Sequence, residues 1–216
     1  MQLKTPVKAS AINNLTDARY FSAWGVEWLG FNMNFGDQNY LEPKAIKEIK
    51  EWLVGPYMVG EFVGNQSPEQ IIELVTQLKL DMVQVGMFAS VELIKELNGI
   101  AVIKEWILSD WSDLEGLGNQ LAVFSANVEF FLLDLTKNGL TWEVLSQKAE
   151  ALAQLQRLCK SYPIMLSIDF RAEDYNDLVG CLVLRGLSLQ GNEEEKVGYK
   201  SFEELDAIFE ILEIFI

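Results

Sequence analysis

A strand, a polar turn and an amphipathic helix follow one another in a unit that repeats along the chain, and this repeat limits the fold more than any other feature. The clearest copy is Tyr57–Leu74, YMVGEFVGNQSPEQIIEL, where an apolar run and a polar break precede apolar residues at helical spacing. Ser67 is placed to accept a hydrogen bond from a free amide at the helix start, and Gln70 can reach back to the amide of the cap. Pro68 is favourable at the first helical position, because the N–H that proline lacks would have no hydrogen-bond partner within the helix there. The unit therefore predicts a strand, a turn and a helix.

Roughly eight copies of this unit can be followed along the sequence. The expected strands are Val7–Ile12, Trp28–Met33, Tyr57–Val63, Asp81–Val85, Ala101–Trp106, Glu129–Leu135, Pro163–Phe170 and Val183–Gln190. The expected helices are one capped by Thr16-Asp17 and running to Trp24, then Pro43–Leu53, Pro68–Leu78, Val91–Leu97, Trp111–Leu121, Trp142–Cys159, Ala172–Leu178 and a last one after the capping-box spacing Ser201–Glu204. The 216 residues contain no linker or composition break. We therefore expect residues 1–216 to form one domain, a closed (β/α)₈ barrel rather than an open doubly wound sheet.

The charge of the chain excludes several classes of partner. Its 17 basic and 32 acidic residues give a formal net charge of −15, which argues against binding to nucleic acid or to an anionic membrane. The same charge disfavours a phosphorylated substrate unless local cations override it. The chain has no histidine, which removes Ser/His/Asp and Cys/His triads and argues against a zinc site. Neither a dinucleotide fingerprint nor a phosphate-binding P-loop is present, so we expect no metal and no cofactor.

The cysteines and the N-terminus bear on the compartment. Cys159 and Cys181 have neither metal-ligand spacing nor a disulfide framework around them, and we interpret both as small buried residues. The first residues, MQLKTPVKAS, contain no apolar signal core, and no uncharged apolar run approaches membrane-spanning length. We expect a cytoplasmic protein.

Polar residues gather where the expected strands end, which is the working face of a (β/α)₈ barrel. They are Lys8, Ser10, Asn32, Asn34, Glu61, Gln84, Lys104, Asp134, Asp169, Arg171 and Gln190. A buried lysine facing a carboxylate can serve as an acid/base pair, because burial and pairing both move pKa values. The same charges can also simply neutralise one another across the barrel mouth. Both interpretations stay open.

Several stretches carry a resemblance to a known family. They are Leu15–Phe31, Val59–Val85, Val102–Lys104, Phe130–Asp134 and the tail from Gly198, with a family pattern F-V-N-x-S-P-E-x-I nearly intact at Phe62–Ile71. In these stretches the chain resembles phosphoribosylanthranilate isomerase of tryptophan biosynthesis, a (β/α)₈ barrel of about this length. The resemblance implies an aminoaldose-to-aminoketose isomerisation with a cysteine in the first strand as general base and an aspartate ending the sixth strand as general acid.

The catalytic pattern is only half preserved. Asp134 stands where the acid is expected, but Ser10 stands in place of the cysteine. An unassisted serine hydroxyl is too weak an acid to act like a thiolate, and only Lys8 is near enough in sequence to help it. To act as a base, Lys8 would have to be neutral.

The substrate-binding pattern of the family is eroded as well. Its arginine after the second strand is replaced by Asn39, and its histidine after the fourth strand by Gly86. The glycine-rich loop after the sixth strand is reduced to Lys137–Gly139, and the phosphate-binding glycines after the seventh appear as Ile168-Asp169. Gly191, in the loop after the eighth strand, fits the pattern. The residues expected to bind a ligand are Lys8, Asn39, Gln84, Lys104, Asp169 and Gly191.

Three hypotheses for function follow. We favour a diverged barrel that has lost isomerase activity and acts through another small-molecule ligand or as an interaction protein. The alternative is an active isomerase that uses Ser10 and Asp134 on a phosphorylated sugar derivative. The third is a carboxylate-based enzyme in which Glu61, Asp134 and Asp169 hold a cation such as Mg²⁺ or Ca²⁺, or a basic substrate. The apolar end Ile214–Ile216 suggests packing on the barrel or the contact of a homodimer.

Overall fold

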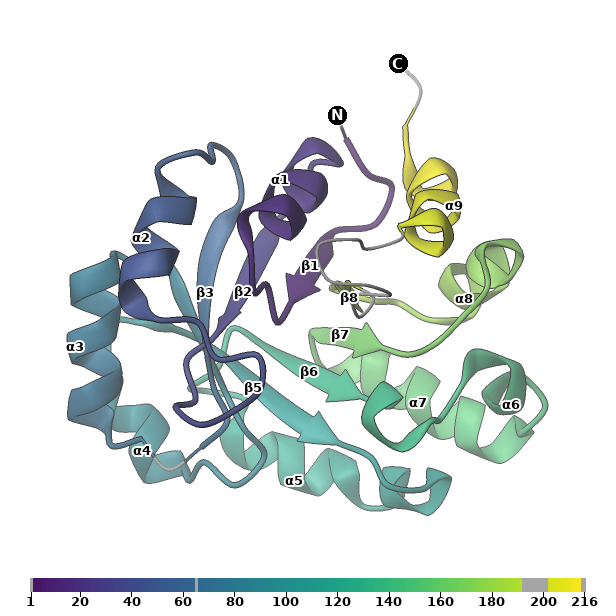
Figure 1. The fold of residues 1–216 in the computed structure, drawn as a ribbon. Helices are drawn as coiled ribbons and strands as arrows, with labels where there is room; N and C mark the ends of the chain where they lie inside the picture. The colour runs from purple at the N-terminus through teal and green to yellow at the C-terminus, as the bar shows by residue number, and fades with distance from the viewer. Residues whose placement is uncertain (1, 65, 192–201, 215–216) are drawn as a thin grey trace.

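Eight parallel strands form a closed barrel in the computed structural model of the chain, which describes residues 2–64, 66–191 and 202–214. The strands are β1 (Val7–Ser10), β2 (Trp28–Asn32), β3 (Tyr57–Phe62), β4 (Met82–Val85), β5 (Ala101–Ile107), β6 (Phe130–Asp134), β7 (Ile164–Ser167) and β8 (Gly186–Gln190). Each strand pairs with its neighbours in chain order, and β8 pairs with β1. The expected (β/α)₈ architecture is confirmed, and Figure 1 shows the helices arranged around the strands.

The connections between the strands are helical. The α-helices are α1 (Leu15–Ala23), α2 (Pro43–Lys50), α3 (Pro68–Leu78), α4 (Val91–Glu96), α5 (Leu117–Phe124), α6 (Trp142–Ser146), α7 (Ala149–Ser161), α8 (Tyr175–Cys181) and α9 (Glu203–Leu212). The described ranges also contain three short 3₁₀ helices, η1 (Trp111–Leu114), η2 (Thr136–Asn138) and η3 (Ala172–Asp174). None of the helices among the described residues has the length and apolar character needed to cross a membrane.

Two predicted helices are interrupted, and one begins earlier than predicted. The segment Trp111–Leu121 divides into η1 and α5 because Gly116 has a φ of +74°. The segment Trp142–Cys159 divides into α6 and α7 at Lys148, whose backbone is not helical. Helix α1 is capped by the side chain of Asn14, which accepts a hydrogen bond from the Asp17 amide, and not by Thr16-Asp17. The spacing of apolar residues cannot reveal that one residue within a helical pattern, such as Gly116 or Lys148, has a non-helical backbone.

Large side chains on the inner faces of the strands fill the half of the barrel interior nearest the amino ends of the strands. They are Trp28, Val59, Met82, Ile103, Phe130, Leu132 and Met165. The guanidinium group of Arg185 lies over the rings of Trp28 and Phe130, at 4.6 and 5.5 Å from their centroids, and donates to Glu27. This packing closes the barrel where the strands begin, so the open end is where they finish.

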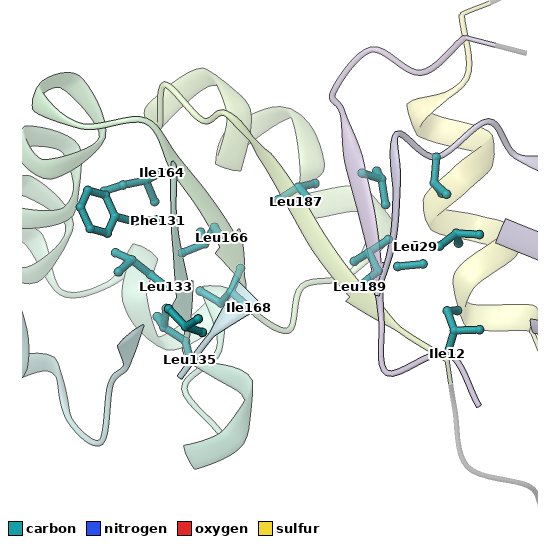
Figure 2. Close-up of a cluster of buried hydrophobic side chains, with 14 of the residues drawn as sticks. Ile12, Leu29, Phe131, Leu133, Leu135, Ile164, Leu166, Ile168, Leu187 and Leu189 are labelled. Atoms are coloured by element: carbon teal, nitrogen blue, oxygen red, sulfur yellow. The ribbon is translucent and has the colours of Figure 1, made fainter. Parts of the chain in front are cut away.

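The outer faces of the strands pack against the helices. In Figure 2, Phe131, Leu133 and Leu135 from the β6 segment lie beside Ile164, Leu166 and Ile168 from the β7 segment, all of them buried. Because the outer faces of the strands are mainly apolar and β2 to β7 also carry large apolar side chains on their inner faces, the sheet is covered on two sides. The polar residues that remain on the inner face are concentrated at the strand ends.

The segment before β1 is hydrogen-bonded to the segment at the end of α9. The amide of Lys4 donates to the carbonyl of Leu212, and the amide of Ile214 donates to the carbonyl of Gln2. The expected cap at Ser201 and the tail residues Phe215 and Ile216 lie outside the described residues.

Candidate functional site

A cavity of about 200 Å³ lies at the carboxyl ends of the strands. Each strand contributes a polar side chain to its wall, in chain order Ser10, Asn32, Glu61, Gln84, Glu105, Asp134, Ser167 and Ser188. Strand alternation explains this ring, because residues two apart point to the same face and the residues two positions earlier fill the barrel core. The working face expected from the sequence is thus a hollow lined by polar groups.

An ion pair forms the floor of this cavity. Lys8 is fully buried, and its ammonium group donates hydrogen bonds to Glu61 Oε1 and, at 2.7 Å, to Ser10 Oγ. The pair fits because β2 presents Gly30 beside it. A Cβ at Gly30 would overlap Glu61 Oε1 and lie 2.7 Å from Lys8 Nζ. Lys8, Ser10 and Glu61, which the sequence analysis placed at the barrel mouth, are thus in direct contact.

Ser10 is held by hydrogen bonds that do not activate it. Its Oγ accepts from the Lys8 ammonium and lies 2.8 Å from Ser188 Oγ. A serine nucleophile or base needs a neighbour that removes its proton, whereas an ammonium group donates protons and a second hydroxyl is no stronger a base. These contacts fix the position of the Ser10 hydroxyl without raising its basicity.

Asp134 ends β6 and is anchored by the turn that follows it. Its Oδ1 accepts hydrogen bonds from the Thr136 amide at 3.0 Å, the Thr136 hydroxyl at 2.8 Å and the Lys137 amide at 3.2 Å. Its Oδ2 lies 3.4 Å from Lys137 Nζ. Although burial alone would lower the pKa of Lys137, the carboxylates of Glu105 and Asp134 outweigh it and raise this pKa.

Glu105 is a site residue that the sequence reasoning missed. It points inward from β5, is 2% exposed, and its Oε1 accepts a hydrogen bond from Lys137 Nζ. Burial raises the pKa of Glu105 and outweighs the opposing effect of Lys137, while the charges of Asp134 and Glu61 add to the rise. Period-two alternation from Ala101 could have found it, because that pattern places residues 101, 103 and 105 on one face.

Lys104 lies elsewhere than expected. Because Ile103 and Glu105 point into the barrel, Lys104 points outward, into the layer between β5 and α5. Its Nζ donates to the carbonyl of Gly86 at 2.5 Å and lies 5.1 Å from the centroid of the Phe124 ring. Lys104 is therefore not part of the cavity wall, and the structure does not place it with the other expected ligand-binding residues.

The remaining expected binding residues fall into two neighbouring hollows. Asn39 and Gln84 line the cavity at the barrel mouth. Asp169 and Gly191 line an adjoining hollow between the ends of β7 and β8. Burial, with a smaller contribution from the charge of Asp134, raises the pKa of Asp169.

The three acids suggested as a cation site do not form one. Glu61 is already paired with Lys8, and Asp169 faces the adjoining hollow and not the cavity that Asp134 lines. Among the residues that the structure describes, no group of three histidine, cysteine, aspartate or glutamate side chains is placed to hold a metal ion.

Several curated proteins named phosphoribosylanthranilate isomerase resemble the chain in sequence. A curated phosphoribosylanthranilate isomerase from Thermotoga petrophila is 31% identical over 112 residues. That stretch is 50% of this chain and 54% of the relative, so the chain spans about half the length of the curated relatives it matches first. No protein-family model matches the chain.

Solved structures match nearly the whole chain. The phosphoribosylanthranilate isomerase of Thermus thermophilus superposes with a TM-score of 0.73 at 25% identity, over 96% of this chain and 98% of that one. A second phosphoribosylanthranilate isomerase, solved with reduced 1-(o-carboxyphenylamino)-1-deoxyribulose 5-phosphate, gives a TM-score of 0.72 at 22% identity over the same shares of the two chains. In sequence and in fold, the chain is similar to the phosphoribosylanthranilate isomerases.

Proposed function

We propose that this chain is a diverged barrel of the phosphoribosylanthranilate isomerase type, whose mouth binds a small molecule but which does not carry out the normal isomerase reaction. One observation carries the proposal. At the position where the resemblance puts the catalytic cysteine, the hydroxyl of Ser10 accepts a hydrogen bond from the buried ammonium group of Lys8.

Lys8 cannot take over the role of the base. An ammonium group has three N–H donors and no acceptor, and that of Lys8 already donates to Glu61 Oε1 and Ser10 Oγ. The aldose-to-ketose rearrangement requires one group to remove a proton from carbon and another to supply one. The resemblance assigns the role of the acid to Asp134, but the expected base, Ser10, is a hydroxyl beside a cation.

The phosphate-binding positions support the same conclusion. The ligand of one structural relative is a 5-phosphate. In this chain the place of the phosphate-binding glycines is taken by buried Ile168 and by Asp169, whose carboxylate repels a phosphate. At Gly86, where the family has a histidine, a Cβ would lie 3.0 Å from Val63 Cα, so a larger side chain would require the backbone just after β3 to shift.

The alternative function is an active isomerase that uses Ser10 and Asp134. The placement of Asp134 supports it, because this carboxylate lines the cavity at the end of β6 and is held by three hydrogen bonds to one of its oxygens. Under this alternative, Ser10 would act through Lys8 and the phosphate would be bound without the glycine amides.

Loss of phosphoribosylanthranilate fluorescence distinguishes the two functions. The chain, Asp134→Asn and the exposed control Asp177→Asn would each be purified from a host that lacks its own isomerase. We expect no turnover by any of the three, with near-ultraviolet circular dichroism showing that all are folded. Turnover that is retained in Asp177→Asn and abolished in Asp134→Asn would overturn the proposal in favour of an active isomerase.

A further inference from the structure

Two buried oxygen atoms in the wall of the cavity accept no hydrogen bond from any described residue. They are Oε2 of Glu105 and Oε1 of Gln84, in side chains that are 2% and 4% exposed. Both side chains line the cavity. Because a buried acceptor without a donor is costly, these atoms indicate a partner that the described residues do not supply.

The two acceptors come from neighbouring strands and face the same space. Gln84 of β4 pairs with Ile103 of β5, two residues before Glu105 on the same face of that strand. The two side chains are thus diagonal neighbours on the inner surface of the barrel, within reach of one small molecule.

The charge around them favours a cation. Among the residues that the structure describes, four carboxylates line the cavity, those of Asp37, Glu61, Glu105 and Asp134. In the same described part of the chain, two ammonium groups oppose them, that of Lys137 in the wall and that of Lys8 beneath it. Lys137 donates to Oε1 of Glu105, and no described residue donates to Oε2. An ammonium group carries three N–H donors and no acceptor, which suits a carboxylate and an amide oxygen together.

We propose that the barrel mouth binds a small organic molecule with a primary ammonium group, which donates hydrogen bonds to Glu105 Oε2 and Gln84 Oε1. The cavity of about 200 Å³ restricts this ligand to a few non-hydrogen atoms within the barrel. This inference rests on the part of the proposed function in which the barrel mouth binds a small molecule. It is independent of isomerase turnover, because neither Glu105 nor Gln84 is the acid or the base of that reaction.

Calorimetric titration tests the proposal with simple probes. Ethanolamine, serinol and putrescine are the amines, ethylene glycol is the neutral counterpart of ethanolamine, and glycolate is the anionic one. All would be titrated in an amine-free buffer at neutral pH and constant ionic strength. We expect at least one amine to bind about tenfold more tightly than ethylene glycol, and glycolate not to bind.

Two substitutions locate the binding. Glu105→Gln keeps the size of the side chain and removes its charge, and Gln84→Met removes the acceptor without changing the net charge. We expect Glu105→Gln to weaken amine binding about tenfold or more and Gln84→Met about threefold or more. The matched control Glu96→Gln removes an exposed carboxylate, and its affinity should stay within about twofold of the unmodified chain because screening weakens distant charges.

The possible results separate clearly. Failure of all three amines to bind, or equal affinity for ethanolamine and ethylene glycol, overturns the ammonium site. Equal weakening by Glu105→Gln and Glu96→Gln also overturns it, because the amines would then respond only to the net charge. If Glu105→Gln does not fold, unchanged binding in Gln84→Met is sufficient to reject the proposal.

Discussion

Lys104 is a charged side chain held in the apolar layer outside the barrel. It is fully buried, its ammonium group donates to one carbonyl, that of Gly86, and the rings of Trp106 and Phe124 lie 5.4 and 5.1 Å away. Burial lowers the pKa of Lys104 from 10.5 to about 8, although the nearby charge of Glu105 partly opposes this. Near neutral pH, the burial of this charged group therefore lowers the free energy of unfolding.

Lys104→Met is expected to stabilise the chain at pH 7, by roughly 2 kcal/mol, because it keeps the length of the side chain and removes the buried charge. Between pH 8 and 10.5 the unfolded chain binds more protons at Lys104 than the folded chain does, so the stability of the unmodified chain rises with pH through this window. The advantage of Lys104→Met should therefore shrink as the pH approaches 10.5.

Urea unfolding at several pH values measures this difference. The exposed Lys160→Met is the matched control and should show a small effect that does not depend on pH in this way. A stability advantage of Lys104→Met that stays constant from pH 7 to pH 10.5 would contradict the assignment of the lowered pKa to Lys104.

Among the elements, helix α3 is the one whose start was predicted in atomic detail. Ser67 Oγ accepts from the Gln70 amide at 3.4 Å, and the Ser67 amide donates to Gln70 Oε1 at 2.9 Å. This capping box depends on residues three apart and on nothing distant in the fold, so the sequence was sufficient to find it.

Ser67→Ala should therefore lower the free energy of unfolding by about 1 kcal/mol, because it leaves an amide at the start of α3 without its acceptor. Thr76→Ala, an exposed substitution inside the same helix, provides the control. It should be neutral or stabilise by roughly 0.5 kcal/mol, since alanine is the better helix former. Equal effects of the two substitutions in chemical denaturation would argue against the cap.

Which residues of a strand point into the barrel, in contrast, could not be predicted from the sequence for every strand. The barrel order and most site residues follow from the repeat, and Ser10, Glu61, Gln84 and Asp134 all lie at the predicted mouth. At β5, both faces of the strand are buried, so hydrophobicity does not distinguish inside from outside. Choosing Lys104 instead of Glu105 was a one-residue error of phase, and such an error moves a side chain to the other side of the sheet.

At the scale of the molecule, the first and last elements close the fold together. Strand β8 pairs with β1, and the ring of Phe209 in α9 lies 6.1, 5.9 and 5.2 Å from those of Tyr20, Phe21 and Trp24 in the α1 region. Tyr20 also donates a hydrogen bond to Asp206 at 2.7 Å, and burial followed by this contact raises the pKa of Tyr20. We infer that the described parts of the chain unfold as one unit, because neither the first nor the last elements can detach without breaking the contacts that close the barrel.

Phe209→Ala tests this unity. Phe209 is fully buried, so the substitution should cost about 3 to 5 kcal/mol through lost contacts and the cavity left behind. This destabilisation should move a single cooperative unfolding transition to a lower urea concentration, at which tryptophan fluorescence and far-ultraviolet circular dichroism change together. Phe88→Ala, at a side chain that is 90% exposed, should change stability by no more than about 0.5 kcal/mol. If Phe209→Ala instead separated the two signals into distinct transitions, α9 and its neighbours would form a unit of their own, and the cooperative closure of the barrel would have to be abandoned.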